Sequence, residues 1–439
     1  MDLMNAGKGN SMRVLWVCNI MPPIIGQYLG KECSVKEGWI SGILARILRE
    51  EEQIELGISY PVTEQSEETR TIIQIDNNKN IACYGFAEDM VNPENYGGEE
   101  LEKRFDAIIR DFQPEVLHIF GTEYGHSLAA ARAMNNPAKT LVGLQGVISE
   151  CAKEYMADLP VEVQKHVSFR DWLKKDSMKQ QQEKFFIRGE REKEVLKLCS
   201  HVTGRTEFDK NAAGTMNSNA VYHHMNETMR GEFYEGKWSR EACREHSIFF
   251  SQADYPLKGF HYLLQALKEI REKYPDVTIN VAGNSLVNYK TLKDKIKISA
   301  YGKYLRKLVK ELHMEDKIRF LGKLSADEMK QQYLNCHTFV CASSLENSPN
   351  SVGEAMLLGV PVVASNTGGI PSMVEHEKEG LLFEKGNTKA LAKAIMRTWE
   401  QNAQVNMMNE NARTRARKTH DADENYRALL GIYRNIINT

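Results

Sequence analysis

The chain has 439 residues, which is long for a single hydrophobic core, so we expect two domains. Its formal net charge of -2 at pH 7 disfavours nucleic acid as a partner, because proteins that bind phosphate backbones usually carry a clear basic excess. The eight cysteines have no zinc-site spacing. No apolar run approaches bilayer-spanning length, and residues 1–11 lack the apolar core of a signal peptide. The expected location is the cytoplasm.

Short apolar runs and helical periodicities alternate along the first half. The first run, RVLWVCN at 13–19, predicts a strand, and the helix after it repeats apolar residues at 3.6-residue spacing from Trp39 to Leu48. Further strands are expected at 54–59, 116–121, 140–145, 201–206 and 220–224. This alternation predicts a parallel sheet covered by helices on both faces.

The second half alternates more regularly. Strands are expected at 247–251, 277–282, 317–322, 338–342, 361–365 and 380–383, with helices near 259–273, 302–313, 325–335, 352–358, 371–376 and 387–400. We therefore predict an α/β protein with two doubly wound, Rossmann-like domains, at 12–230 and 231–415, facing each other across a cleft. The last helix, within 416–439, could pack back on the N-terminal domain or on the second one.

Two charged segments allow more than one interpretation. The stretch 160–199 predicts a long helix that could present Trp172, Phe185 and Phe186 to a membrane. Its interspersed acids favour instead an insertion with a solvated face. Basic residues crowd 290–310, where a solvated helix face is favoured over a phosphate- or lipid-facing role.

The stretch SSLENSPNSVGE at 343–354 carries the most chemical information. It leaves a predicted strand, crosses a turn rich in Ser, Asn and Pro, and opens a helix that ends near Gly359. A helix start at the carboxyl edge of a parallel sheet directs backbone N–H groups and partial positive charge toward a bound anion. A diphosphate is therefore expected there, with the amides of Asn350 and Ser351 as its main donors.

Two carboxylates flank this turn, Glu346 before it and Glu354 in the first helical turn. A carboxylate accepts two hydrogen bonds and suits vicinal sugar hydroxyls, but it is a poor phosphate ligand. We therefore assign the carboxylates to sugars and the amides to phosphates. The alternative is that Glu354 only complements the helix N-terminus and Glu346 is a solvated loop residue.

The order of motifs in the second half favours the first assignment. Glu346 and Glu354 form an E-x7-E pattern followed by AMLLGVPVVAS, then by TGGIP from Thr367 and EGLLF from Glu379. This set, dense between 247 and 400, closely resembles retaining glycosyltransferases of family four, the glycosyl transferases group 1. The resemblance implies the GT-B fold, with a thinner match in the N-terminal half, which would bind the acceptor.

Several roles follow from this resemblance. Glu354 would hold the donor ribose, Glu346 would contact the transferred sugar, and the backbone of Leu321, Gly322 and Lys323 would border the base. Lys258, in PLKG, matches the lysine that neutralises the leaving diphosphate, where charge grows as the glycosidic bond breaks. The alternative interpretation of Lys258 is that it is an ordinary lysine at a helix start.

One family residue is missing. Relatives usually carry an arginine shortly before this lysine, but the chain has SQADY at 251–255. Arg205, after the strand at 201–206, is a candidate substitute, and a structural salt bridge is the other interpretation of this residue. The loop 26–38 resembles the glycine loop of the family but lacks its adjacent glycine pair.

The N-terminal half offers candidates near the reacting centre. In VLHIFGTEYGH at 116–126, Phe120 occupies the position of the histidine that many relatives carry. His118, Glu123 and His126 are therefore candidate catalytic residues, with a buried structural role as the alternative for His118. Gln145 and Gly146 are expected to line the acceptor site.

The resemblance implies a transferase of hexosyltransferase type that retains anomeric configuration, with the donor phosphate accepting the acceptor proton. We expect no metal and no cofactor beyond a UDP- or GDP-sugar co-substrate. The acceptor would be a saccharide or lipid-linked saccharide of surface polysaccharide or glycoconjugate biosynthesis, with peripheral membrane contact as an option. An epimerase of the same fold and a non-catalytic nucleotide-sugar-binding subunit are the alternatives; a dehydrogenase is disfavoured because no GxGxxG follows either first strand.

Overall fold

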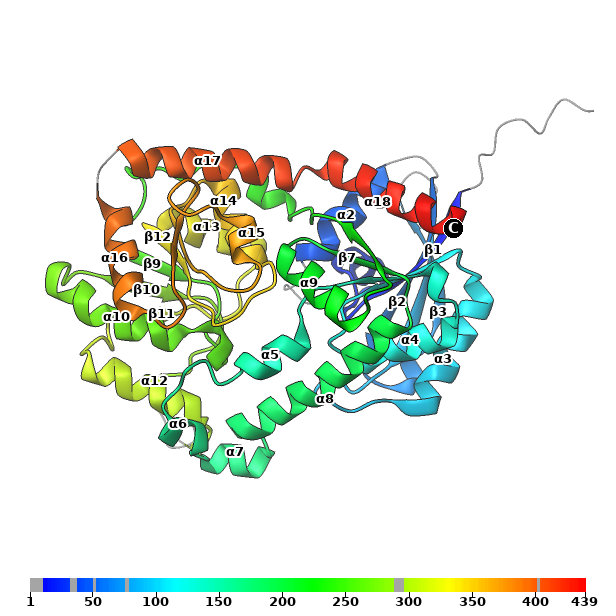
Figure 1. The fold of residues 1–439 in the computed structure, drawn as a ribbon, viewed down its shortest axis with the longest axis horizontal. Helices are drawn as coiled ribbons and strands as arrows, with labels where there is room; N and C mark the ends of the chain where they lie inside the picture. The colour runs from blue at the N-terminus through cyan, green and yellow to red at the C-terminus, as the bar shows by residue number, and fades with distance from the viewer. Residues whose placement is uncertain (1–10, 32–37, 50–52, 76–78, 288–295, 401–402) are drawn as a thin grey trace, which may run out of the picture. The chain divides into compact units, whose positions relative to one another are not determined.

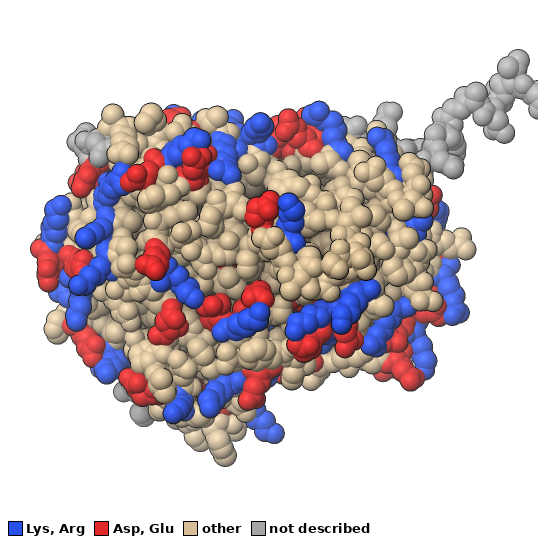
Figure 2. All heavy atoms as spheres, viewed as in Figure 1, with Lys and Arg blue, Asp and Glu red and all other residues tan. Residues whose placement is uncertain are grey.

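The structure is a computed structural model that describes residues 11–31, 38–49, 53–75, 79–287, 296–400 and 403–439. The chain forms two α/β units, drawn in Figure 1. The first unit comprises Met1–Ser149, Ile187–Thr228 and Asp421–Thr439, and the second comprises Glu150–Phe186 and Met229–His420. Acidic and basic side chains are interspersed on the face shown in Figure 2, as the small net charge suggests.

The first unit is built on an eight-stranded sheet of order β3-β4-β2-β1-β5-β6-β7-β8. Its strands are β1 Met12–Val17, β2 Ile54–Val62, β3 Arg70–Ile75, β4 Lys79–Ala87, β5 Val116–Phe120, β6 Thr140–Gly143, β7 His201–Gly204 and β8 Val221–His224. All neighbours pair in parallel except β3 and β4, which are antiparallel. The sequence patterns predicted six of these strands and missed the β3–β4 pair.

Helices of the first unit include α1 Pro23–Leu29, α2 Gly38–Arg49, α3 Gly98–Phe112, α4 Gly125–Met134, α9 Glu207–Met216 and α18 Ala422–Asn438. The predicted apolar stripe of α2 is buried at Ile40, Ile43, Leu44 and Ile47. These side chains join the core formed with β1 and β2. Residues 32–37 of the predicted glycine loop lie outside the described residues.

The second unit contains a six-stranded parallel sheet of order β11-β10-β9-β12-β13-β14. The strands are β9 Ser247–Phe250, β10 Thr278–Val281, β11 Ile318–Phe320, β12 Thr338–Cys341, β13 Val362–Ser365 and β14 Leu381–Phe383. Its helices include α10 Phe260–Lys273, α12 Ala300–Glu311, α13 Ala326–Asn335, α14 Asn350–Leu358, α15 Ile370–Met373, α16 Thr388–Trp399 and α17 Ala403–Thr419. All six strands were predicted, whereas α17 was not.

The expected long helix at 160–199 is interrupted. After α5 (Ile148–Glu154), the chain forms α6 Val161–Lys165, α7 Phe169–Lys174 and α8 Met178–Lys197. Ser168 starts α7 with a capping box, in which its hydroxyl accepts from the amide of Asp171. The interruption corrects the prediction of one continuous helix.

Residues 150–186 pack on the second unit, although the expected first domain, 12–230, included them. The buried Asp171 accepts a hydrogen bond of 2.8 Å from the amide of Ala300 at the start of α12. His261 on α10 bonds the carbonyl oxygen of Ala157 at 2.8 Å. These contacts, between residues more than 100 positions apart, could not be inferred from local periodicity.

The C-terminal helix α18 packs on the first unit. The hydroxyl of the buried Tyr433 accepts a hydrogen bond of 2.9 Å from Nε1 of Trp16 and lies 2.7 Å from Nδ1 of His118. A neutral His118 can accept the hydroxyl hydrogen, which gives a consistent chain of donors. This polar contact in an apolar core orients α18 against β1 and β5.

Acid will destabilise the protein through His118. Burial lowers the pKa of His118 to about 3, so the unfolded chain binds a proton that the folded chain rejects. Its contribution to the free energy of unfolding will therefore fall by about 1.4 kcal/mol per pH unit between about pH 6 and pH 3. Urea unfolding at several pH values will measure this slope. His118→Leu should flatten it, and His224→Leu, at an exposed position of the same unit, should not.

None of the helices in the described ranges combines the length and the apolar character that a membrane crossing needs.

Candidate functional site

A short turn after β9 is attached to the carboxyl end of β12. The 3-10 turn Pro256–Lys258 ends at Gly259, which has a positive φ of 68°. A Cβ atom on Gly259 would collide with the carbonyl oxygen of Ala342. The amide of Ser344 donates to the carbonyl oxygen of Leu257 at 2.7 Å. These contacts fix where the side chain of Lys258 emerges.

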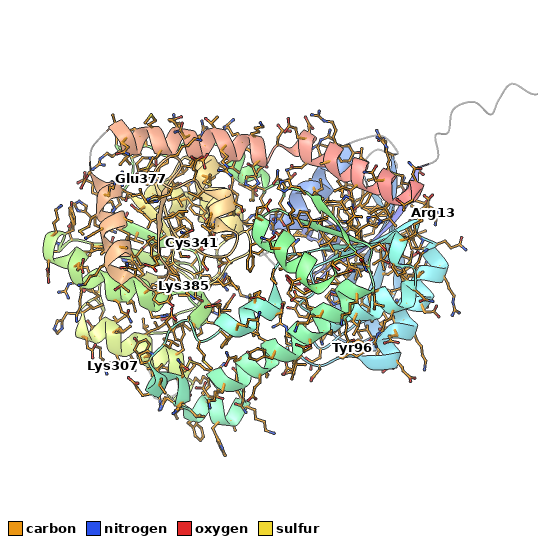
Figure 3. All side chains as sticks on the ribbon, viewed as in Figure 1. Arg13, Tyr96, Lys307, Cys341, Glu377 and Lys385 are labelled. Carbon is orange, nitrogen blue, oxygen red and sulfur yellow. The ribbon has the colours of Figure 1, made fainter. Side chains whose placement is uncertain are left out.

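Lys258 and Glu346 form an ion pair at this edge. The Nζ atom lies 2.7 Å from Oε1 of Glu346, which also accepts from the Ser343 hydroxyl at 2.7 Å. Burial alone would lower the pKa of Lys258, but the adjacent Glu346 carboxylate and Tyr255 outweigh it and the pKa lies above its ordinary value. The structure thus brings together two predicted site residues and keeps Lys258 cationic. Cys341, labelled in Figure 3, marks the end of β12 at this edge.

The Thr367–Gly368–Gly369 run supports the backbone of Glu346. The amide of Gly369 donates to the Glu346 carbonyl oxygen at 2.9 Å, and the Thr367 hydroxyl donates to the carbonyl oxygen of Ser344 at 2.9 Å. A Cβ atom at Gly368 would collide with the Glu346 carbonyl oxygen. This part of the resemblance therefore has a structural function, since it orients the loop that carries Glu346.

The helix start expected to bind phosphate lies in the same loop. Helix α14 begins at Asn350, so the amides of Asn350 and Ser351 belong to its first turn, as predicted. Just before it, the hydroxyl of Ser348 is buried and has no hydrogen-bond partner among the described residues. Buried hydroxyls without partners are uncommon, and an anion at this helix start would satisfy it.

Glu354 lies deeper than expected for a ligand-binding carboxylate. It is 4% exposed, pairs with Arg230 at 2.8 Å and accepts from the Tyr333 hydroxyl at 3.1 Å. Burial raises the pKa of Glu354, although Arg230 and Tyr333 act against this rise. Sequence reasoning missed Arg230, which lies within residues 226–245, where the periodicity of the sequence lapses between the two halves, and Tyr333, which lies in α13.

The loop predicted to border the base follows β11. Gly322, with φ 77°, exchanges backbone hydrogen bonds with Gly283 at the end of β10, with N–O distances of 2.7 and 3.1 Å. Leu321 and Lys323 flank it at the carboxyl edge of the sheet. This edge is where ligands of open parallel sheets bind.

A cavity of about 1040 Å³ opens in the second unit beside these loops. Its walls include Asp254 and Tyr255 after β9, Asn284 after β10, Arg170 on α7 and Tyr301 on α12. The ring of Tyr255 also lies 5.7 Å from Nζ of Lys258. The cavity therefore adjoins the Lys258–Glu346 pair.

In the first unit, two of the predicted catalytic residues belong to one polar network. Asn19 donates to Oε2 of Glu123 at 3.0 Å, and the amide of Gly146 donates to Oε1 at 3.2 Å. The other end of Asn19 lies 2.9 Å from Nε2 of His126, whose Nδ1 and amide contact Glu88. His126 is fully buried. Asn19 and Glu88 were not predicted.

The donor and acceptor roles in this network fix the orientation of the Asn19 amide. Glu123 only accepts, so Asn19 must turn its amide nitrogen to Glu123 and its oxygen to His126. His126 then donates from Nε2. Its Nδ1 faces an oxygen of Glu88. Glu88 and Asn19 therefore hold the ring of His126 from both of its nitrogens.

The other predicted residues lie apart from these groups. His118 is fully buried against Tyr433, which favours its structural alternative. Arg205 forms an ion pair with Glu227 inside the first unit, as the structural interpretation of this arginine requires. Gln145 is half-buried beside Gly146.

Glu88→Gln will lower the free energy of unfolding by about 1–3 kcal/mol, because it weakens a buried, charge-assisted hydrogen bond. Chemical denaturation at neutral pH will measure the change. Glu102→Gln is the control, since Glu102 of the same unit forms a more exposed ion pair with Arg132 and should cost less than about 1 kcal/mol. Equal losses in both variants would contradict the network.

Comparison with known sequences finds relatives of the second unit. Residues 239–415 match the family model "Glycosyl transferases group 1". A "Putative glycosyltransferase YtcC" of Bacillus subtilis is 30% identical over 192 residues, which is 43% of this chain and 45% of that protein. A "Putative colanic acid biosynthesis glycosyltransferase WcaL" of Escherichia coli is 26% identical over 144 residues, 31% of this chain and 32% of that protein. The matches thus cover less than half the length of these curated relatives.

Solved structures match over nearly the whole chain. A sucrose-phosphate synthase of Thermosynechococcus elongatus superposes with a TM-score of 0.68 at 14% identity, covering 97% of this chain and 99% of that one. HepE of Anabaena, solved with UDP-glucose, gives a TM-score of 0.63 at 17% identity, covering 97% and 100%. At such identities the likeness shows the fold, which is GT-B as predicted. Residues 239–415 therefore belong to the glycosyl transferases group 1 family, in a chain with the GT-B fold.

Proposed function

We propose that this chain is a retaining glycosyltransferase that moves a sugar from a UDP- or GDP-sugar to a saccharide acceptor. The observation that carries the proposal is the Lys258–Glu346 ion pair beside the start of α14. It combines a permanent cation, a carboxylate for sugar hydroxyls and first-turn amides for phosphates. A nucleotide diphosphate sugar presents the matching groups in one molecule.

The donor would lie along the carboxyl edge of the second sheet. Its diphosphate would meet Ser348 and the amides of Asn350 and Ser351, and its transferred sugar would meet Glu346. Its base would lie against residues 321–323, and Glu354 would reach the ribose only if one of its oxygens accepted a further bond beside Arg230. The adjoining cavity, at about 1040 Å³, lies just above the upper end of the range of about 300–1,000 Å³ that is usual for ligand sites.

The chemical step would depend on fixed charge. As the bond from the anomeric carbon to the diphosphate breaks, negative charge grows on the leaving oxygen, and Lys258 would stabilise it. The donor phosphate would accept the acceptor proton on the same face, which gives retention. We propose that this step requires no metal, because a protein cation takes the role that magnesium has in other transferases.

The acceptor is proposed to be a saccharide or a lipid-linked saccharide of surface polysaccharide or glycoconjugate biosynthesis. The relative named for colanic acid biosynthesis supports this pathway class, and the neighbour solved with UDP-glucose supports a UDP-sugar donor. Glu123, His126, Gln145 and Gly146 would contribute to the acceptor side.

Donor screening will test the proposal. The full chain should hydrolyse or transfer from one class among UDP-, GDP- and dTDP-sugars, with retained configuration at the anomeric carbon by proton NMR. Activity should persist in excess EDTA. Isomerised sugar formed from donor alone would instead identify an epimerase, and donor binding without any turnover, with every acceptor class tried, would identify a non-catalytic subunit.

A further inference from the structure

Helix α7 and its flanks expose an unusual concentration of apolar side chains. Among the described residues, the large apolar side chains that are exposed include Phe169 at 59%, Trp172 at 67% and Leu173 at 66%, with Val161 and Val167 close by in the chain. We call these five residues the apolar tip. Single exposed apolar residues are common, but a local cluster of them usually marks an interaction surface.

The apolar tip is held outward by a fixed helix. Asp171, on the inner side of α7, is 1% exposed and accepts from the amides of Ala300 and Ser168. Arg170 binds Asp171 at 3.0 Å and Asp176 at 2.7 Å. Arg170 and Asp171 of α7 therefore face the protein, whereas its apolar residues face away together with Lys174, which is nearly the reverse of an ordinary surface helix. The rings of Phe169 and Trp172 lie 6.0 Å apart.

The charges around the apolar tip are mostly basic. Lys165, Lys174, Lys175 and Lys179 are exposed, and Glu162 is the exposed acid among residues 161–179. The two aspartates of this segment are bound to Arg170 and to backbone amides. The positive charge of these exposed lysines contrasts with the net charge of -2 for the whole chain.

The adjacent helix α12 extends the basic surface. Lys303 lies 3.5 Å from His166, and Lys307, labelled in Figure 3, follows one turn later. In Figure 2, blue lysine and arginine atoms, with some red acidic atoms among them, flank uncharged atoms at the lower end of the molecule, where Figure 1 places α7.

We propose that the apolar tip inserts into the interface of a lipid bilayer that carries anionic headgroups. Phe169, Trp172 and Leu173 would enter the boundary between headgroups and acyl chains, and the lysines would lie at the level of the lipid phosphates. Each lysine held near such a surface strengthens binding roughly fivefold. The charge around the tip favours an anionic bilayer over an uncharged partner. The inference rests on residues 161–179 and α12, and it holds whether or not the proposed transferase activity does.

Vesicle sedimentation with the full chain will test the proposal. The protein should bind vesicles of phosphatidylcholine with about 30 mol % phosphatidylglycerol at least tenfold more tightly than pure phosphatidylcholine, and high salt should weaken this binding. Lipids brominated on the acyl chain should quench tryptophan fluorescence. Trp16, Trp238 and Trp399 are buried, so Trp172 is the exposed reporter among the tryptophans whose side chains the structure describes.

Matched variants separate the contribution of the apolar side chains to vesicle binding from that of the lysines. The double variant Trp172→Ser, Leu173→Ser should lose at least about tenfold in affinity and most of the quenching. Met407→Ser, at an apolar position of the same unit with 60% exposure, should bind as the parent does. Lys174→Glu with Lys175→Glu should abolish the preference for anionic vesicles.

Three outcomes would overturn the proposal. They are equal binding to neutral and anionic vesicles, full binding by the serine double variant, and a concentration-dependent dimer that this variant abolishes. Affinity for UDP and GDP, measured on each variant, reports on the donor site and the fold. Loss of vesicle binding with unchanged nucleotide affinity therefore concerns the apolar tip alone.

Discussion

Lys258→Met will lower the turnover number for the donor about 100- to 1,000-fold, the loss typical of removing one group that stabilises transition-state charge. Lys258 is the cation that approaches Glu346 at 2.7 Å, at the edge where the leaving diphosphate would lie. The Michaelis constant should change much less than the turnover number, because the charge on the leaving oxygen exists mainly in the transition state. Steady-state kinetics with the preferred donor will separate the two constants.

A control is available in the same unit. Lys385, labelled in Figure 3, pairs with Glu154 at 2.5 Å, and its side chain is 29% exposed against 20% for Lys258. Lys385→Met therefore removes an ion pair of the same unit that does not involve Glu346 and should leave the turnover number within about twofold. If Lys258→Met retained near-parental turnover, or if both variants lost activity equally, Lys258 would not be the cation of the reaction.

Gly259→Ala will lower the free energy of unfolding by roughly 2–5 kcal/mol, from a left-handed backbone and a steric collision together. The new Cβ would meet the carbonyl oxygen of Ala342, so the turn after β9 would have to move away from β12. Because that turn carries Lys258, turnover should fall as well. Chemical denaturation and donor kinetics on the same preparation will measure both effects.

Gly98→Ala separates the cost of a left-handed backbone from the cost of the steric collision with Ala342. Gly98 has a φ of 60°, close to the 68° of Gly259, but a Cβ there has nothing within 4 Å. The Gly98→Ala variant should lose only about 1–2 kcal/mol of unfolding free energy and should keep its activity. A similar loss at both positions would mean that the contact with Ala342 has no role in holding the turn.

The fold of the second unit could be predicted almost completely. Strands β9, β12 and β13 are runs buried on all residues and bounded by turns, which is the pattern that sequence periodicity detects best. Helix α17 was missed, although Val405, Met408, Ala412 and Ala416 are buried at helical spacing, because two of the four are small alanines. In the first unit, the edge strand β3 was missed because the exposed Ile72 next to the buried Ile73 breaks the alternation of apolar and polar residues that predicts a half-buried strand.

The residues of the candidate site also differ in whether the sequence could predict them. Motif order identified Lys258, Glu346 and the start of α14, because these residues follow strands at the carboxyl edge of the sheet. It did not identify Arg230, which pairs with Glu354 from 124 positions away, or Glu88 and Asn19, which hold His126 and Glu123. Such partners are brought together by strand order, which no local pattern records.

The sequence by itself determined the alternation of strands and helices and the loops that carry Lys258 and Glu346, because both depend on residues that are neighbours in the chain. The tertiary structure alone decided that Lys258 meets Glu346 across 88 positions, that residues 150–186 pack on the second unit, and that α7 turns its apolar side outward. The physical reason is that each of these features depends on a close approach between residues far apart in the chain. The turn that carries Lys258 packs against the Ala342 carbonyl, residues 150–186 are bound through the Ala157 carbonyl, and α7 is bound through the Ala300 amide.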